Sequence, residues 1–312
     1  MADKTEIVIF GGIIVDQYVL VDRYPERGGD ALMTDSFFRV GGCAINVGST
    51  LQNLGMTPHI VSTVGDDAWG RKIREYLKQR QFSELAIRYA EQRNSGYCIS
   101  VVEKDGERTF LTYKGCEAEF QSGMIGDDLC GRVSHVYVTG YYLLDPEYDR
   151  EIVRQLKKLK EAGAFVVFDP GPLAGSISED TLLAVLGLAD LIIPNESELE
   201  LLERKLGWNR RDFSGYWERG ILYIVLKKGS QGVEVWTDGA YFTVPPYPVN
   251  SIDSTGAGDS FAGGLLYGLS KGHDLRTSVK MASACGAITT TIMGPHGRFT
   301  LQDVTDMMEK AR

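Results

Sequence analysis

The sequence has no long apolar run and no recognisable leader segment. No window approaches the roughly 18 unbroken apolar residues that a membrane-spanning helix requires. The apolar N-terminal segment is broken by Asp16 and Gln17, and no basic region precedes a cleavable apolar core. We therefore expect neither a signal peptide nor a membrane partner.

Paired cysteines are also missing. The five cysteines are odd in number, scattered along the chain, and form no C-x-x-C motif. This usage is typical of a protein of the reducing cytoplasm and argues against a structural metal site, so we interpret the thiols as small buried apolar groups. They are Cys43, Cys98, Cys116, Cys130 and Cys285.

Excess positive charge is absent as well. The formal net charge of −9 argues against nucleic acid or an anionic membrane as the main partner. A small anionic ligand held by a few local donors remains compatible with this charge.

Two common nucleotide-binding motifs are not found. A P-loop kinase needs G-x-x-x-x-G-K-[ST], and the chain contains no Gly-Lys pair. A dinucleotide-binding fold needs G-x-G-x-x-G directly after its first strand, and "FGGIIVD" (10–16) does not supply it. Any nucleotide site must therefore be built differently.

Short β-branched runs alternate with helical patterns through most of the chain. Near-continuous apolar strands joined by crossover helices predict an α/β protein with a doubly wound, mostly parallel sheet flanked by helices. The expected strands lie at 6–10, 58–65, 135–140, 165–171, 189–195 and 222–229. The expected helices lie at 44–55, 68–80, 150–163, 179–187, 196–207, 258–270, 274–290 and 301–311.

Two segments interrupt this alternation. Residues 13–40 are turn-rich, and residues 95–114 place Asp105-Gly106 between two strand-like arms, a strong hairpin signal. We expect these segments to form a small β-sheet lid. Without a repeat or a Pro/Ser-rich linker, we predict that 1–312 is a single domain with the lid inserted in it. The exposed strand edges of the lid favour a homodimer formed through the lid.

The stretch "DSTGAGDSF" (253–261) places Gly256, Ala257 and Gly258 at the start of an expected helix. The first turn of a helix offers unpaired N–H groups and the positive end of the helix dipole. Without bulky side chains, an anion can come within hydrogen-bond distance of these donors. This turn therefore predicts a binding site for a phosphoryl group.

Asp259 follows this turn directly. It could be a plain N-terminal helix acid, but a cap does not need three preceding small residues. As a general base it would take the proton of a substrate hydroxyl that attacks the bound phosphorus. We therefore predict that Asp259 is catalytic.

The chain resembles the ribokinase-like (PfkB) family of carbohydrate and nucleoside kinases over nearly its whole length. The family's two signatures are similar to "DSTGAGDSF" and to "GGCAINVGSTLQNLG" (41–55). Further matching motifs are "VGDDAWG" (64–70), "DGERTF" (105–110), "NESE" (195–198) and "KKGSQGV" (227–233). The resemblance implies a ribokinase-like fold and an ATP- and Mg²⁺-dependent kinase.

The resemblance also assigns the substrate site. It implies that Gly41, Gly42 and Asn46 hold the substrate's hydroxyls, with Asp16 as a hydroxyl acceptor at the lid junction. The alternative for the "GG" pair is a plain strand-to-helix turn.

For the nucleotide, the resemblance implies that Asn195 and Glu198 organise Mg²⁺ through water. Glu198 could instead be only a capping-box acid. The residues that the resemblance places along the nucleotide are Lys227, Lys228, Gly229, Ser230, Gly232 and, beside the adenine, Ser283.

A monovalent cation is used by some relatives, near the positions of Asp253, Thr255 and the turn at 293–299. Arg298 stands where a small residue is common among those proteins. This difference argues against a K⁺ site.

The sequence thus predicts a cytoplasmic kinase that transfers the γ-phosphoryl group of ATP to a hydroxyl of a small sugar or sugar-like substrate. A nucleoside kinase is the alternative, since Tyr141 or Tyr142 could stack on a base as well as on a sugar ring. A ligand-binding homologue without catalysis is a second alternative, although both the base and the glycine turn are present.

Overall fold

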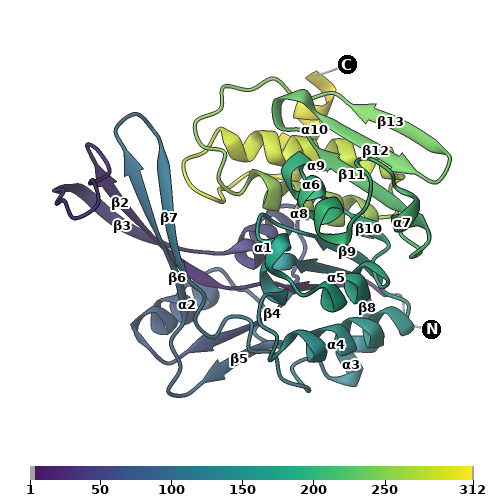
Figure 1. The fold of residues 1–312 in the computed structure, drawn as a ribbon, viewed down its shortest axis with the longest axis horizontal. Helices are drawn as coiled ribbons and strands as arrows, with labels where there is room; N and C mark the ends of the chain where they lie inside the picture. The colour runs from purple at the N-terminus through teal and green to yellow at the C-terminus, as the bar shows by residue number, and fades with distance from the viewer. Residues whose placement is uncertain (1–3, 311–312) are drawn as a thin grey trace.

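A computed structural model describes residues 4–310 of the chain, in which a large mixed sheet forms the body and a smaller sheet stands off one side (Figure 1). The body sheet has nine strands in the order β13-β12-β11-β10-β9-β8-β1-β4-β5. From β11 to β5, every two adjacent strands are parallel to each other. The predicted α/β class and mostly parallel sheet are confirmed.

The body elements follow the predicted alternation closely. The body strands are β1 (Glu6–Phe10), β4 (His59–Gly65), β5 (Ile87–Ala90), β8 (Val133–Thr139), β9 (Phe165–Asp169), β10 (Leu191–Ile192), β11 (Tyr223–Lys227), β12 (Val233–Thr237) and β13 (Ala240–Val244). The helices are α1 (Cys43–Asn53), α2 (Ala68–Gln79), α3 (Asp127–Arg132), α4 (Asp149–Glu161), α5 (Glu179–Leu186), α6 (Glu196–Leu206), α7 (Ser214–Trp217), α8 (Ala257–Ser270), α9 (Leu275–Thr290) and α10 (Leu301–Lys310). Residue 311, the predicted last residue of this helix, lies outside the described residues.

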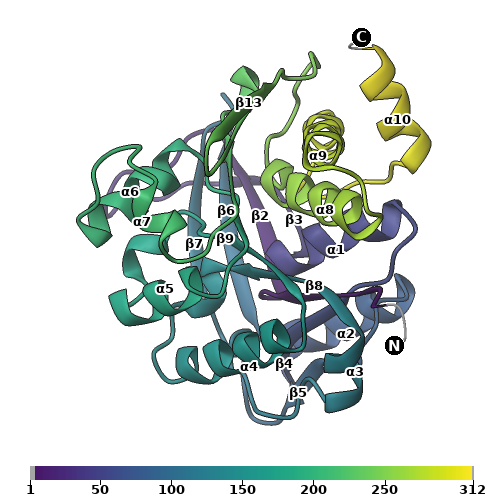
Figure 2. The same cartoon turned by 90° about the vertical axis from the view of Figure 1, so that its right-hand side faces the viewer.

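Helices cover both faces of the body sheet, and each face has its own apolar core. Figure 2 shows α1, α8 and α9 on one side of the sheet and α4, α5 and α6 on the other. Alternate residues of β1 point to opposite faces, so that Ile7 and Ile9 pack in one core while Val8 and Phe10 pack in the other. The amphipathic helices therefore seal a sheet whose strands are apolar on both faces.

Three details of the sheet differ from the prediction. The strand expected at 189–195 is reduced to two ladder residues, because Pro194 has no N–H to donate and the chain turns into α6. Strand β5 and the antiparallel pair β12–β13 at the sheet edge were not predicted. These are short strands flanked by turns, where the local pattern is weak.

The smaller sheet, called the lid sheet below, has the strand order β3-β2-β6-β7. It consists of β2 (Ile14–Val21), β3 (Met33–Gly41), β6 (Gly96–Glu103) and β7 (Arg108–Tyr113), which fall in the predicted segments 13–40 and 95–114. The predicted hairpin turns at Asp105-Gly106, with Gly106 at a φ of 94°. Its action as a lid stays a prediction.

The five cysteines are free, and four of them are buried, as expected for small apolar groups. Cys43 is half-buried. Within residues 4–310, none of the helices combines the length and the apolar character needed to cross a bilayer.

Candidate active site

A cavity of about 400 Å³ lies at the carboxyl ends of the parallel body strands, where open α/β sheets bind their ligands. We call it the inner cavity. Strands β8, β9 and β11 each end at its wall. Its lining residues are Cys43, Tyr137, Thr139, Tyr141, Asp169, Gly171, Pro172, Asn195, Glu198, Lys227, Gly229, Gly256, Gly258 and Asp259.

The glycine turn forms one wall of the inner cavity. Gly256 precedes α8 with a φ of 74°, and a Cβ there would collide with the carbonyl oxygen of Pro295, so only glycine fits. Ala257 N donates to Ser254 O at 3.2 Å. For the N–H groups of Gly256 and Gly258, no acceptor is found within residues 4–310. These two donors can therefore receive an anion, as predicted for the turn.

Asp259 lies in the first turn of α8 and also faces the inner cavity. Burial raises the pKa of this carboxyl to about 7, with Asp169 adding to the effect and the hydrogen bond from Asn46 opposing it. Asn46 Nδ2 donates to Asp259 Oδ2 at 2.8 Å. A carboxyl with a pKa near neutrality can both take up and release a proton at physiological pH.

Asn46 is therefore placed against the predicted base. It lies on α1 and is buried, and its other polar atom, Oδ1, is also buried and has no hydrogen-bond partner within the described residues. The structure shows a contact of Asn46 with Asp259 that the sequence did not predict. The expected contact of Asn46 with the substrate stays a prediction.

Asp16 comes from the lid sheet and lies beside the start of α1. Its Oδ2 lies so close to Gly41 that a Cβ on Gly41 would clash with it. Gly42, which follows Gly41 in the chain, caps α1 with a φ of 89°. Burial raises the pKa of Asp16 to about 7, and the charges of Asp259 and Glu117 add to this. The Asp16 carboxylate has no hydrogen-bond partner within residues 4–310, which leaves its oxygens available to a ligand.

Two charged residues near Asp16 were not predicted from the sequence. Glu117 is buried, its carboxylate lies against Gly12, and Lys114 forms an ion pair with it. Lys114 Nζ also lies 5.1 Å from the ring centre of Tyr141. Both residues follow the hairpin in an irregular segment, where no sequence periodicity indicates which side chains turn inward.

A buried charge cluster also lines the inner cavity. Lys227 Nζ lies 3.1 Å from Asp169 Oδ2 and 3.9 Å from Glu198 Oε2. Burial opposes the charged form of Lys227, but the two carboxylates outweigh it and hold its pKa above the usual value. Lys227 was predicted at the nucleotide. Asp169 was missed, although an acid directly after the apolar run 165–168 is the signal that could have indicated it.

Asn195 and Glu198 form a full capping box at the start of α6. Asn195 N donates to Glu198 Oε2 at 2.7 Å, and Glu198 N donates to Asn195 Oδ1 at 2.9 Å. The structure thus shows Glu198 as a capping-box acid, the alternative that the sequence left open. Glu198 also lines the inner cavity. Capping and ligand binding do not exclude each other here.

This wall fits a Mg²⁺ ion held mainly through water. Within residues 4–310, no group of three or more His, Cys, Asp or Glu side chains could hold a metal ion directly. Mg²⁺ usually keeps several waters and takes one or two carboxylates beside the phosphates. Burial raises the pKa of Glu198 while Lys227 lowers it, so a nearby cation would favour its charged form.

A second cavity of about 660 Å³ continues from the inner cavity, and we call it the outer cavity. The two share Lys227, Gly229 and Gly258. Many of the residues that line the outer cavity are apolar, namely Val233, Pro246, Tyr247, Val249, Ala257, Phe261 and Ala287. The predicted nucleotide residues Lys228, Ser230, Gly232 and Ser283 also line it. The volume and the apolar lining suit a nucleoside.

The side chain of Lys228 is engaged elsewhere. Its Nζ lies 2.8 Å from Glu234 Oε1 and 3.8 Å from Glu196 Oε1. Lys228 can therefore contribute its backbone to the outer cavity, whereas Lys227 points its ammonium group into the inner one.

Asp253 lies outside both cavities, at the base of the glycine turn. Its Oδ1 accepts from Arg108 Nη1 at 2.7 Å and from Thr255 N at 2.9 Å, and its Oδ2 accepts from Gly294 N at 2.9 Å. Burial alone would raise the pKa of Asp253, but these donors lower it to about 2. The cation at Asp253 is thus Arg108. Arg298 is exposed and lines a different surface cavity.

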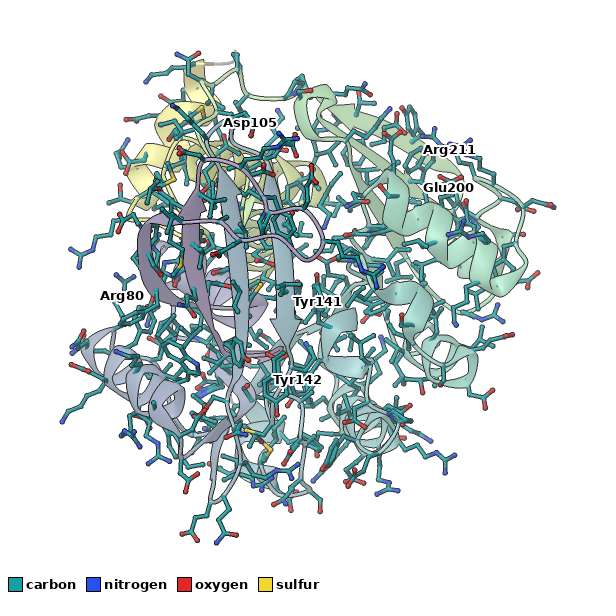
Figure 3. All side chains as sticks on the ribbon, turned by 60° about the vertical axis from the view of Figure 1, so that its left-hand side comes forward. Arg80, Asp105, Tyr141, Tyr142, Glu200 and Arg211 are labelled. Carbon is teal, nitrogen blue, oxygen red and sulfur yellow. The ribbon has the colours of Figure 1, made fainter. Side chains whose placement is uncertain are left out.

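Of the two neighbouring tyrosines, only Tyr141 faces the site. Tyr141 lines the inner cavity, and Tyr142 is fully buried and packs at an edge-on angle against Phe10. Figure 3 shows Tyr141 near the place where the hairpin joins the body, far from Asp105 at the hairpin tip. Tyr141 is therefore the aromatic residue that could contact an acceptor molecule.

Two curated relatives resemble this chain over most of its length. The uncharacterised sugar kinase YegV of Escherichia coli K12 is 28% identical, covering 95% of this chain and 91% of its own. The ATP-dependent ribose-1-phosphate kinase of Halopiger xanaduensis is 30% identical, covering 89% of this chain and 90% of its own. The likeness therefore extends over both the body and the lid sheet.

The solved structures give the same result for the fold. The fructokinase of Xylella fastidiosa, solved with bound ATP, superposes with a TM-score of 0.84 at 21% identity and covers 99% of both chains. This agreement confirms the ribokinase-like fold. Residues 4–298 match the pfkB family of carbohydrate kinases. The chain therefore belongs to the pfkB family of carbohydrate kinases and is a phosphotransferase with a hydroxyl acceptor.

Proposed function

We propose that this protein transfers the γ-phosphoryl group of ATP to a hydroxyl of a small neutral sugar, with Asp259 as the general base. The observation that carries the proposal is the wall of the inner cavity. There the Asp259 carboxylate and the N–H groups of Gly256 and Gly258 face the same space. A base and anion donors side by side are what phosphoryl transfer requires.

ATP would lie across both cavities. The apolar lining of the outer cavity, which includes Ser283 at its wall, suits the base, and the backbone from Lys227 to Gly232 suits the ribose and phosphates. The γ-phosphoryl group would then meet the start of α8, where Lys227 Nζ is also close to Gly258. This pose leads the charged end of the nucleotide toward a region where N–H donors and an ammonium group lie close together.

Mg²⁺ bound to the nucleotide would neutralise phosphate charge. Glu198 and Asp169 would hold its water ligands, and Asn195 would fix the orientation of Glu198 through the capping box. Lys227 already compensates these two carboxylates, which lowers the cost of keeping them charged in the cavity wall.

Proton transfer to Asp259 and phosphoryl transfer to the acceptor oxygen occur together. The acceptor hydroxyl gives its proton to Asp259, and its oxygen forms a bond to the γ-phosphorus while the bond from that phosphorus to the β,γ-bridging oxygen breaks. ADP leaves with the bridging oxygen. The hydrogen bond from Asn46 keeps the Asp259 carboxylate oriented toward the acceptor. Base catalysis of this type contributes about 10²–10⁴-fold.

The charges around the acceptor position support a neutral sugar. Three carboxyls lie near it, from Asp16, Glu117 and Asp259, whereas the nearby cations are already paired, Lys114 with Glu117 and Lys227 with Asp169. Carboxylates accept hydrogen bonds from sugar hydroxyls, and they repel a carboxylate or phosphate on the acceptor. Water would be excluded when the lid sheet closes over this group.

The test is a phosphorylation screen with neutral sugars, sugar acids, sugar phosphates and nucleosides, with products detected by mass spectrometry. We expect turnover with a neutral sugar and loss of turnover in Asp259→Asn. Nucleosides belong in the panel because Tyr141 faces the cavity and could stack on a base. Nucleotide binding without turnover of any acceptor would contradict the proposal and favour a ligand-binding role.

A further inference from the structure

Arg108 links the lid sheet to the base of the glycine turn. It is the first residue of β7, and its Nη1 donates to Asp253 Oδ1 at 2.7 Å and also to Thr255 Oγ1. The Asp253 side chain is fully buried, and Arg108 is 21% exposed. A buried, charge-assisted contact of this kind is costly to break, because Asp253 would be left as an uncompensated charge.

The strand register places Arg108 and Asp16 on the same face of the lid sheet. Arg108 pairs with Val102, which pairs with Leu20, and Leu20 is four residues from Asp16 on β2. Residues four apart on a strand share a face and lie roughly 13 Å apart. One face of this sheet therefore carries both the acid expected to bind the acceptor and the arginine that holds the glycine turn.

A second contact from the lid sheet reaches the same turn. Arg39 on β3 donates through Nη1 to Met293 O at 2.9 Å, in the segment that ends at Pro295. The carbonyl oxygen of Pro295 packs directly on Gly256. The lid sheet thus contacts the turn before α8 directly through Arg108, and through Arg39 it contacts the segment that packs on Gly256.

We infer that Arg108 is a positioning residue that couples closure of the lid sheet to the orientation of the Gly256 and Gly258 N–H groups. The inference rests on the proposed function, since it takes these groups as the donors to the transferred phosphoryl. Acceptor binding at Asp16 stabilises the closed sheet, Arg108 then fixes Asp253 and Thr255, and the turn is ordered for the nucleotide. Because such coupling is reciprocal, nucleotide binding also strengthens acceptor binding.

The first test measures this coupling by calorimetry. The affinity for a non-hydrolysable ATP analogue with Mg²⁺ is determined with and without the acceptor found in the screen. In the wild type we expect the acceptor to tighten nucleotide binding at least about fivefold.

Arg108→Gln should abolish this gain in nucleotide affinity, and Arg108→Lys should keep part of it because the charge remains. Lys104→Gln, in the same hairpin and exposed, is the matched control and should keep the full gain. An equal gain in Arg108→Gln and the wild type would overturn the inference.

The second test needs no acceptor. Hydrogen exchange of the backbone amides is compared in wild type, Arg108→Gln, Arg108→Lys and Lys104→Gln. In Arg108→Gln we expect faster exchange of the amides in both 96–113 and 253–258. In Arg108→Lys and Lys104→Gln we expect exchange close to that of the wild type. Exchange in 253–258 that is unchanged by Arg108→Gln would overturn the coupling.

The two proposals fail in different ways. If no hydroxyl compound is phosphorylated, the proposed function fails, while hydrogen exchange still decides whether Arg108 orders the turn. A double variant, Arg108→Gln with Asp253→Asn, tests whether the two residues act together. If they act through one contact, the turnover of the double variant should match that of the less active single variant. A loss of turnover equal to the product of the two single losses would contradict this.

Discussion

Asn46 on α1 donates its side-chain N–H to Asp259 on α8, with a distance of 2.8 Å between Nδ2 and Oδ2. This contact joins the two sequence motifs that lie more than two hundred residues apart. It also gives Asn46 a contact that its motif did not indicate. A residue expected at the substrate donates a hydrogen bond to the carboxylate proposed as the general base.

Replacing the base should remove most of the turnover. Asp259→Asn keeps the shape of the side chain but cannot accept the proton, so we expect kcat to fall at least about 10²-fold with little change in nucleotide affinity. Steady-state kinetics and calorimetry measure the two quantities. Asp306→Asn, an exposed acid on α10, is the control and should behave as the wild type. Near-normal turnover of Asp259→Asn would remove the base assignment.

The pH profile should report the ionisation of Asp259. Since the pKa of this carboxyl is raised to about 7 and the deprotonated form is the active base, kcat/KM should rise with pH through about 7 and then level off. Asn46→Leu should move the inflection to higher pH, because it removes the hydrogen bond that favours the charged form. Asp16 has a similar pKa, and Asp16→Asn separates the two groups. If Asp259 is the group that titrates, the profile of Asp16→Asn should keep the inflection. A flat profile from about pH 5 to 9 contradicts the assignment.

A side chain at Gly258 should block the phosphoryl position. The nearest atom to a Cβ at this position is Lys227 Nζ, 3.7 Å away, so the Cβ of Gly258→Val has room and the side chain adds bulk beside the inner cavity. We expect a normal melting temperature and a loss of turnover of about 10²-fold or more, comparable to the removal of an oxyanion-hole donor. Gly131→Ala, on α3 and away from both cavities, is the control, because an added Cβ there meets no atom within 4 Å. Unaffected turnover of Gly258→Val would place the phosphate elsewhere.

Monovalent cations should have little effect on turnover. Arg108 and the N–H groups of Thr255 and Gly294 already satisfy both oxygens of Asp253, which leaves a K⁺ ion little negative charge to bind. Rates in K⁺, Na⁺ and tetramethylammonium chloride at equal ionic strength should therefore agree within about twofold. Strong activation specific to K⁺ would show that Arg108 moves away during catalysis.

The lid sheet should mediate a homodimer. Phe38, Leu111 and Tyr113 are exposed, and the register places them on the face opposite to Asp16. Large exposed apolar side chains that share one sheet face favour association. We expect sedimentation to show a dimer in the wild type and a monomer in Leu111→Asp. A monomeric wild type at high concentration would contradict this prediction.

The sequence by itself determined the alternation of the body and the location of the catalytic motif. The runs "EIVIF" and "FVVFD" are apolar on both faces, and only a helix-covered parallel sheet can bury such strands. Gly256 and Gly258 could be assigned to an anion site because the start of a helix has unpaired N–H groups wherever it lies. Asp105-Gly106 fixed the hairpin for an equally local reason.

Only the tertiary structure decided which charged groups meet. The contacts of Arg108 with Asp253, of Asn46 with Asp259, and of Lys227 with Asp169 each join segments far apart in the chain. Glu117 and Lys114 lie in irregular segments, where no period relates sequence position to direction. Pairing of this kind depends on how the strands and helices pack in space. The pattern of a single sequence specifies each element, but not the partner that each side chain finds across the fold.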